Sequence, residues 1–453
     1  MFIRQHHPRL GVLFFCFFLL SACGTKHVAP SAKIHLTSWM NTPEDVRRFP
    51  QDLNVYANIA GRDKFLMNVA EQTALDARFN QIFFGPWDMS ATSVRRKDAT
   101  AIFRKASGYK LGGVPWQQVE WEKMGRNALM ENFPARHEHA VTLRNTDLRE
   151  MPTHEPRFTK PTPDPRADPF DMFQYSLLPP GTPLFIAHTT LDGRWHYVEC
   201  PIAGGWVDAL DVALVDADFE RVYRTGSYVA LVRDNVRLAD AFAGVGAVFP
   251  AIGGKNAANG RNIMFPVKGL DGMARISEIA LGPADAALKP ILFTAGNVAR
   301  IGNVMMAQQY GWGGMFGNRD CSALTRDIMM PFGIWLPRNS LAQARRGVVH
   351  HLDSMSPDVK ESFILGNGVP FASLVGMRGH IMLYVGKYKG HAAVFHNVWG
   401  IRVVDGVNSN ARLVIGRSVV TSLTPGKELK NMYLSTTFAD RVRTLTNLAD
   451  KHF

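Results

Sequence analysis

The hydrophobic pattern of the chain changes its period near residue 150, and this change constrains the fold most. Before it, the apolar residues of the segments 63–79 and 116–132 recur at helical spacing. After it, runs such as Pro183–His188 and Trp195–Cys200 are strand-like and are joined by the turn Asp192-Gly193. A chain that is helical first and then built from short strands is predicted to be an α+β protein of several domains.

Prolines mark the boundary between these two regions. Residues 151–169 contain six of them, a density that disfavours helix and sheet, so we expect an extended linker there. The linker would follow a mostly helical domain, residues 37–150, which carries no chemical motif and is interpreted as a packing domain. Beyond it, residues 170–217 and 218–287 resemble two small SH3-like β-barrels, the second more weakly.

The N-terminus has the pattern of an export signal. Its apolar core, residues 10–20, would span only ~16 Å as a helix, too short for a bilayer of ~30 Å, so residues 1–22 are predicted to be a signal peptide. Leu20-Ser21-Ala22-Cys23 resembles the lipobox of bacterial lipoproteins, which implies a lipidated Cys23. The expected location is the periplasmic face of the cell envelope, favouring the outer membrane in a Gram-negative source. The alternative is an ordinary signal peptide with an incidental cysteine.

Cysteine content and charge distribution argue against a disulfide scaffold and against a nucleic-acid-binding protein. Four cysteines in 453 residues exclude a disulfide scaffold. The net charge of +12 is spread along the chain, so we expect no nucleic-acid partner; a mild positive field also suits anionic membranes or wall polymers. In the mature protein only Cys200 and Cys321 remain apart from the lipidated residue, and they are either a disulfide pair or one inert and one reactive thiol. Cys200 ends an apparent strand and is predicted to be apolar filler.

Cys321 has the surroundings of a nucleophile. A glycine-rich aromatic loop leads to Asp320, a good N-cap, and residues 321–330 have helical composition up to a proline. The helix N-terminus favours a thiolate, so Cys321 is expected to be acidic, and its free amides can receive an oxyanion. His380 and His396 lie on the two strands of a predicted hairpin, where one can act as base and the other can orient it.

These features together resemble the NlpC/p60 cysteine peptidases over about residues 295–435. Upstream of this region, Tyr223–Tyr228 resembles the start of the second barrel in relatives that carry two barrels. The residues that carry the resemblance are Tyr310, Trp312-Gly313-Gly314, Asp320-Cys321-Ser322, Gly333, Leu336-Pro337-Arg338, Ser340, Gln343, His380–Gly386 and His396, preceded by Phe170-Asp171, Gln174, Gly181–Leu184 and Gly205–Val207 in the first barrel.

The resemblance implies a papain-like catalytic domain, residues 288–440, and cleavage of peptidoglycan stem peptides between γ-D-glutamate and an L-diamino acid such as meso-diaminopimelate. Cys321 would attack, His380 would move the proton, His396 would orient His380, and Tyr310 would help to hold the oxyanion. No metal or cofactor is implied.

Substrate contacts are assigned to Asp320, Ser322 and Asn339. Relatives with barrels prefer stems with a free N-terminal L-Ala, and some bind its ammonium with an aspartate where this chain has Asn339, which lacks the charge. Two other functions stay open: a wall-binding adaptor with a degenerate peptidase, and an acyltransferase or lipid hydrolase on the same fold. An intact Cys321, His380 and His396 set argues against the adaptor.

Overall fold

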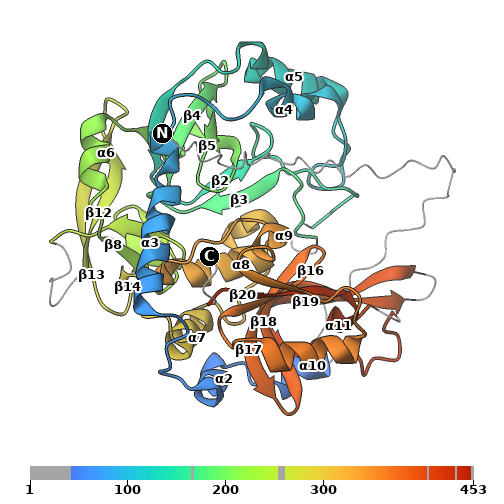
Figure 1. The fold of residues 1–453 in the computed structure, drawn as a ribbon. Helices are drawn as coiled ribbons and strands as arrows, with labels where there is room; N and C mark the ends of the chain where they lie inside the picture. The colour runs from blue at the N-terminus through green and yellow to red at the C-terminus, as the bar shows by residue number, and fades with distance from the viewer. Residues whose placement is uncertain (1–41, 165–167, 254–260, 406–407, 434–435, 450–453) are drawn as a thin grey trace, which may run out of the picture.

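The computed structural model describes residues 42–449, apart from 165–167, 254–260, 406–407 and 434–435. The predicted signal peptide, residues 1–22, and Cys23 lie outside the described residues. In Figure 1 the strands from the middle of the chain lie on one side and those of the C-terminal third on the other, and helix α3 runs beside both. Among the residues described, none of the helices combines the length and apolar character that a membrane span needs.

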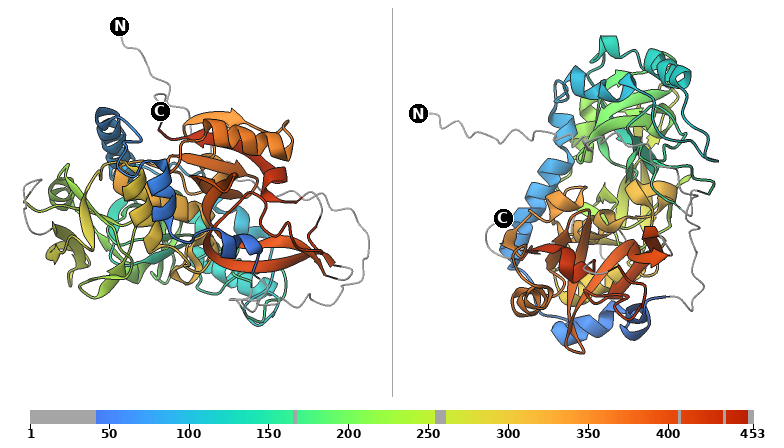
Figure 2. Two further views of the ribbon diagram at one scale, coloured as in Figure 1. Left: turned by 90° about the horizontal axis from the view of Figure 1, so that it is seen from below. Right: turned by 90° about the vertical axis from the view of Figure 1, so that its right-hand side faces the viewer.

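The N-terminal helices pack onto the other parts of the protein. Tyr56 of α2 lies in the hydrophobic core of the C-terminal part. Phe79 and Phe83 of α3 pack with Tyr223 and Met330, from two further parts of the chain, and in the right-hand view of Figure 2 this helix runs along one side of the molecule. This segment therefore holds the other domains together. Its helices are α1 (Glu44–Arg48), α2 (Leu53–Ala60), α3 (Val69–Phe83), α4 (Arg96–Ala99) and α5 (Gln118–Ala128).

The helix predicted over residues 63–79 is displaced along the chain. It begins at Val69 because the Asn68 side chain accepts the backbone N–H of Ala70 at 2.8 Å, the geometry of an N-cap. It then continues to Phe83. The second predicted helix, residues 116–132, corresponds to α5 and a following 3₁₀ turn, Met130–Asn132.

The first β domain is larger than predicted. Its seven-stranded antiparallel sheet has the order β3-β2-β6-β5-β4-β1-β7. The assignment of residues 37–150 as helical is wrong at its end, because β1 and β2 belong to this sheet. The long-range pairing of β1 with β4 decides this, not local propensity. The strands are β1 (Glu138–Thr142), β2 (Thr146–Arg149), β3 (Gln174–Leu178), β4 (Pro183–Thr189), β5 (Trp195–Glu199), β6 (Gly204–Asp208) and β7 (Val212–Leu214).

Residues 151–169 are likewise not an interdomain linker. They connect β2 to β3 within the first sheet and are held by side chains from elsewhere. Arg149 donates to the carbonyl oxygens of Thr153 and Glu155, and the Trp116 indole donates to that of Pro156 at 3.1 Å. These donors satisfy backbone carbonyl groups of a segment that lies outside the strands of the sheet.

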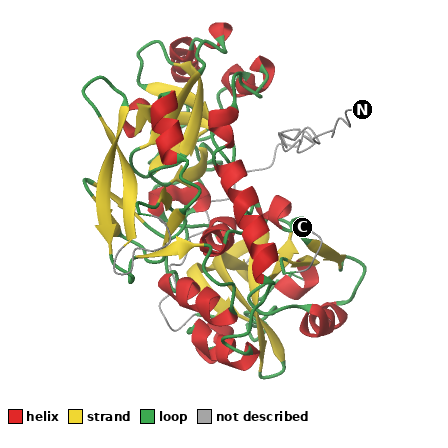
Figure 3. Ribbon diagram, turned by 60° about the vertical axis from the view of Figure 1, so that its left-hand side comes forward, coloured by secondary structure: helices red, strands yellow, loops and turns green. Residues whose placement is uncertain are grey.

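The second β unit follows helix α6 (Ala217–Tyr223) and consists of short strands in three small sheets. Val229, Leu238, Phe249 and Phe265, from four different strands, share one buried core. Figure 3 shows these strands beside the first sheet and apart from the C-terminal sheet. They are β8 (Tyr228–Leu231), β9 (Val236–Leu238), β10 (Ala241–Ala243), β11 (Val248–Pro250), β12 (Arg261–Lys268), β13 (Ala274–Leu281) and β14 (Ala286–Lys289).

The C-terminal domain is built on a six-stranded sheet of order β15-β20-β16-β17-β18-β19. Residues of α2, α7 and α8 pack on one face of it, and residues of α10 and α11 on the other. The elements are α7 (Ala295–Val304), α8 (Cys321–Met329), α9 (Ser340–Gln343), β15 (Val348–His351), α10 (Pro357–Asn367), β16 (Ser373–Met377), β17 (His380–Tyr388), β18 (His391–Asp405), β19 (Asn408–Thr421), α11 (Phe438–Arg441) and β20 (Val442–Asn447).

Candidate active site

Cys321 is the first residue of α8, as predicted. The helix starts there because the Asp320 carboxylate accepts the backbone N–H groups of Ala323 at 2.9 Å and Gly313 at 3.0 Å. The Gly313 bond also fixes the preceding glycine-rich loop. That loop lies close against β3: a Cβ at Gly313, whose φ is +67°, would be 2.4 Å from the carbonyl oxygen of Gln174. The first β domain thus contacts the loop that carries the thiol.

The predicted histidine pair is formed. His380 Nε2 lies 2.8 Å from His396 Nδ1, and His396 Nε2 lies 3.1 Å from the hydroxyl of Thr421. The Thr421 hydroxyl donates its own proton to the carbonyl oxygen of Ser422 at 2.7 Å, so it must accept from His396.

This chain of hydrogen bonds assigns the tautomers of both histidines. His396 carries its proton on Nε2, and its Nδ1 therefore accepts from Nε2–H of His380. The remaining nitrogen of His380, Nδ1, is left without a proton. A neutral imidazole with one bare nitrogen is ready to take a proton from a thiol.

Cys321 lies beside the beginning of β17. The backbone N–H groups of Ile381, the residue after His380, and of Ser322 both stabilise the thiolate form of Cys321. The structure therefore places Cys321 beside the strand that begins with His380, whose ring is hydrogen-bonded to that of His396. All three are buried, with 6%, 8% and 0% exposure for Cys321, His380 and His396.

The expectation of an acidic thiol is not supported. Burial, reinforced by the negative charge of Asp320, raises the pKa of Cys321 to about 12. Burial likewise lowers the pKa of His380 to about 3, helped by the positive charge of Arg441. Desolvation outweighs the helix N-terminus here, so the resting pair is a neutral thiol and a neutral imidazole.

Tyr310 lies near the thiol, where an oxyanion donor is required. Burial, together with the charges of Cys321 and Asp320, raises the pKa of the Tyr310 hydroxyl, which keeps it protonated and able to donate. Its ring lies 5.9 Å from that of Phe170 and 6.0 Å from that of Trp399. Phe170, from the β2–β3 connection, also contacts Trp312 and so forms an aromatic wall with the catalytic loop.

The predicted substrate contacts have other partners. Asp320 forms a two-pronged ion pair with Arg338, at 3.0 and 2.7 Å, and Ser322 donates to Asp320 at 3.0 Å. Asn339 is exposed, and its side-chain oxygen caps α9 by accepting from Ala342 at 2.8 Å. One lone pair of that oxygen is therefore used in the cap of α9.

Several residues of the site were missed by the sequence analysis as functional positions. Thr421 fixes the tautomer of His396, and Phe438 packs against both histidine rings, at 5.8 and 5.4 Å. The position of Thr421 depends on the register of β19 against β18, and that of Phe438 on the packing of helix α11. The sequence holds no signal for either. Arg338 and Phe170 were visible as parts of the family resemblance but not as partners of Asp320 and Tyr310.

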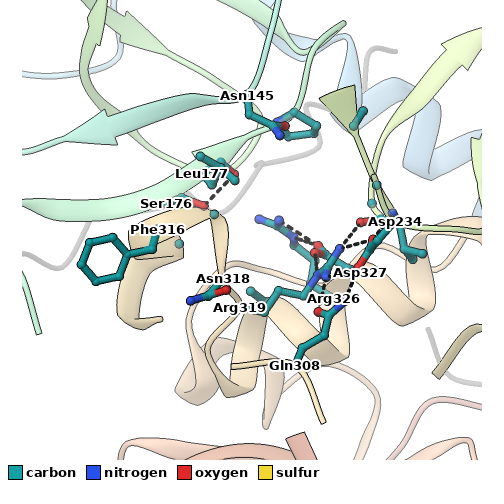
Figure 4. Close-up of a pocket in the computed structure, with 18 of the residues that line it drawn as sticks. Asn145, Ser176, Leu177, Asp234, Gln308, Phe316, Asn318, Arg319, Arg326 and Asp327 are labelled. Atoms are coloured by element: carbon teal, nitrogen blue, oxygen red, sulfur yellow. Dashed lines mark hydrogen bonds and ion pairs between the residues drawn. The ribbon is translucent and has the colours of Figure 1, made fainter. Parts of the chain in front are cut away.

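A polar cleft of about 400 Å³ lies behind the catalytic loop, between the two β units and α8. Cys321 and the histidines do not line it. Figure 4 shows its centre, where Arg319 reaches Asp234 and Asp327. Arg319 precedes Asp320 in sequence. The cleft therefore borders residues that hold the loop before Cys321, and the reacting groups lie outside its lining.

A buried thiol beside a hydrogen-bonded histidine pair is the arrangement of a cysteine peptidase. Three family models match the chain in succession: the NLPC_P60 stabilising domain, N term, over residues 12–133; the SH3 domain of SH3b1 type over residues 156–208; and the NlpC/P60 family over residues 307–414. Residues 307–414 thus form an NlpC/P60 cysteine peptidase domain, and an N-terminal stabilising domain and an SH3 domain precede it.

One solved structure shows the same fold. An NlpC/P60 endopeptidase from Photobacterium damselae subsp. piscicida is 22% identical, with a TM-score of 0.77 over 89% of this chain and 98% of that one. An NlpC/P60 family protein from Bacillus cereus ATCC 10987 is 13% identical, with a TM-score of 0.41 over 62% of this chain and 83% of that one. No curated protein matches the sequence significantly. The α+β architecture and the first SH3 domain are thereby confirmed.

Proposed function

We propose that this protein cleaves the bond between γ-D-glutamate and an L-diamino acid in peptidoglycan stem peptides. The observation that carries the proposal is the relay from Thr421 through His396 to His380, which leaves His380 Nδ1 without a proton at the beginning of β17, the strand that lies beside Cys321. Membership of a cell-wall peptidase family supplies the substrate class.

The reaction follows from these groups. Cys321 Sγ bonds to the γ-glutamyl carbonyl carbon while its proton passes to His380 Nδ1. The oxyanion is held by the backbone N–H of Cys321 and the Tyr310 hydroxyl. His380 then gives the proton to the leaving amine as the C–N bond breaks, and a thioester remains. Water attacks the thioester, with His380 taking a proton from it, and the acid is released as the thiol re-forms. His396 holds the ring of His380 throughout.

A resting neutral pair fits this sequence. Since the pKa of Cys321 is raised and that of His380 is lowered, proton transfer has to accompany the attack instead of preceding it. The imidazolium of His380 and the oxyanion of the substrate then form together in the transition state. The oxyanion donors stabilise the negative charge at that point.

The envelope context is part of the proposal. Lipidation at Cys23 would tether the enzyme to the periplasmic face of a membrane. Residues 218–287 would be a second SH3-like barrel, supported by the single core that their strands enclose. A preference for stems with a free N-terminal L-Ala is also proposed. The Phe170 wall supports it by narrowing the approach to Tyr310, whereas the capping role of Asn339 does not.

The test uses mature protein, residues 24–453, beside its Cys321→Ala variant. Both are incubated with L-Ala-γ-D-Glu-diaminopimelate and with the same peptide attached to muramic acid, and mass spectrometry follows the release of the dipeptide end. We expect the wild type to cleave the free tripeptide and the variant to cleave neither. Cleavage by Cys321→Ala would refute the nucleophile, and an inactive wild type with both peptides would refute the bond assignment. Cleavage of both peptides by the wild type would refute only the free-amine preference.

A further inference from the structure

The polar cleft behind the catalytic loop has no part in the proposed reaction. It encloses about 400 Å³, and ligand pockets commonly enclose about 300–1,000 Å³ and lie where domains meet. Its lining comes from three parts of the protein: Asn145 belongs to the first β domain, Asp234 to the second β unit, and Arg326 to helix α8. The cleft therefore has the size and the position of a binding site.

Arg326, in the second turn of α8, is a buried cation with one open edge. The residue is only 7% exposed, and its Nε and Nη2 both donate to a single oxygen, Oδ1 of Asp327, at 3.0 and 2.8 Å. Its Nη1 has no acceptor among the described residues, and it is not one of the nitrogens that are buried without a partner, so solvent reaches it. Because Arg326 lines the cleft, its Nη1–Nη2 edge is available to a molecule that enters there.

The other two guanidinium groups of the lining are already neutralised. Arg319 uses all five of its N–H groups, on acceptors that include both oxygens of Asp234. Arg338 donates to both oxygens of Asp320. Arg326 therefore carries the one guanidinium edge of the lining that is free for a ligand.

Uncharged amides supply the remaining free hydrogen-bonding capacity. The side chains of Asn145 and Asn318 line the cleft and have no hydrogen-bond partner in the part of the chain that the structure describes. Figure 4 shows Arg319, Arg326 and Asp327 on one side of the cleft and Asn145 on the opposite side. A ligand held by Arg326 thus has amide donors and acceptors around the rest of its length.

These groups fit a carboxylate better than other anions. The open edge of Arg326 presents two parallel N–H groups, the geometry that matches the two oxygens of a carboxylate. A dianion such as phosphate needs more positive charge than one guanidinium edge provides, and leaving a buried charge unpaired is costly. A peptide group next to the carboxylate would find its partners in the amides of Asn145 and Asn318.

We propose that this cleft binds the carboxylate end of a short peptide through Arg326, at a site separate from the reaction centre. Cys321 and both histidines lie outside the lining, so the occupant does not compete for them. The binding itself does not depend on the proposed reaction. Two sources supply such a carboxylate: the dipeptide L-Ala-γ-D-Glu, which the proposed reaction releases, and the C-terminus of an uncut peptide.

The test measures binding by ligand-observed NMR titration to the Cys321→Ala protein, which needs no turnover. The probes are L-Ala-γ-D-Glu, D-Ala-D-Ala and the C-terminal amide of D-Ala-D-Ala. We expect a carboxylate probe to bind at least about tenfold more tightly than the amide, the scale of one charge-assisted hydrogen bond. Adding Arg326→Gln should remove this difference. The matched control is Arg237→Gln, which removes an exposed arginine of β9 outside the cleft and should leave the affinity unchanged.

Each outcome decides the proposal. Binding of L-Ala-γ-D-Glu alone supports a site for the released dipeptide, binding of D-Ala-D-Ala alone supports a site for uncut ends, and binding of both supports a site for any peptide carboxylate. The site is rejected if neither carboxylate binds, if the amide binds equally well, or if Arg326→Gln changes the affinity no more than Arg237→Gln does. Should Arg326→Gln fail to fold, Asn145→Asp decides: Asn145 is exposed, and a negative charge there should weaken carboxylate binding severalfold, whereas an unchanged affinity rejects the site.

Discussion

Replacing Asp234 by asparagine tests whether the second β unit holds the nucleophile in place. Arg319, two residues before Cys321, donates to both carboxylate oxygens of Asp234 at 2.8 and 2.9 Å, and also to Asp327 at 2.7 Å and the carbonyl oxygen of Val245 at 2.8 Å. Its own carbonyl oxygen accepts from Asn397, the neighbour of His396, at 2.9 Å. One residue therefore links the second β unit, the Cys321 loop and the histidine strand, and Figure 4 shows its contacts with Asp234 and Asp327.

The magnitude follows from the burial of this ion pair. The Arg319 and Asp234 side chains are only 13% and 14% exposed, and losing one partner of a buried pair costs about 3–5 kcal/mol. Since Asp327 still pairs with Arg319, we expect the lower end, about 3 kcal/mol, which leaves a protein of typical stability folded. A loosened Arg319 also lets the Cys321 loop shift, and a misplacement of about 1 Å can lower kcat by about 100-fold.

The assay is urea unfolding together with steady-state kinetics on the tripeptide. The matched control is Arg233→Gln at the adjacent residue, whose pair with Asp285 is 65% and 31% exposed and should be worth under about 1 kcal/mol. For Asp234→Asn we expect the loss of stability, a reduced kcat and an unchanged KM. A variant that loses stability but keeps its kcat would show that the pair supports the fold without positioning Cys321. Equal losses in Asp234→Asn and Arg233→Gln would refute the burial argument itself.

The other predictions concern the relay and the charges around it. Thr421→Val should lower kcat at least about tenfold with KM unchanged, because His396 loses the acceptor that fixes its tautomer; wild-type kcat in this variant would contradict the relay. Alkylation of Cys321 by iodoacetamide, followed by mass spectrometry, should accelerate about tenfold per pH unit from pH 7 to 10, because the pKa is raised to about 12. An alkylation rate that is already maximal at neutral pH would instead support the prediction of an acidic thiol. Arg338 lowers the pKa of Asp320 to about 2, so this pair stabilises the fold above pH ~4 and loses that contribution as the pH falls towards 2. Accordingly, the stability difference between wild type and Arg338→Gln, measured by urea unfolding, should shrink by about 2 kcal/mol between pH 5 and 2; a constant difference would contradict the linkage.

Local sequence signals were enough for the parts of the site that are local in structure. Asp320 caps its own helix three residues on, and the hairpin that carries His380 and His396 is closed by a short turn, so both could be predicted. Strands β1 and β2 could not, because their partners lie some 25 to 70 residues away and decide the conformation. The 151–169 segment was misread for the same reason, since distant side chains bind its carbonyl groups.

The prediction of an acidic Cys321 thiol failed for a different physical reason. The helix N-terminus is a local feature, and it favours the thiolate as expected. Burial is not local: Cys321 lies in a core that residues from distant helices and strands enclose, and the backbone of Ile381 in β17 contacts it. Desolvation of a charge is the larger effect, so the packing of distant elements reverses the sign predicted from the motif.

The pairing of Asp320 also decides how a free substrate amine could be recognised. An ammonium that used this carboxylate would have to displace Arg338, whose side chain is only 11% exposed. Leaving that guanidinium unpaired costs about 3–5 kcal/mol, whereas a new charge-assisted hydrogen bond returns about 1.5–3 kcal/mol. The exchange is unfavourable, and Asn339, which lacks the charge and caps α9, does not compensate for it. We therefore propose that any selection for a free N-terminal L-Ala is steric, through the Phe170 ring that the first β domain places against Tyr310.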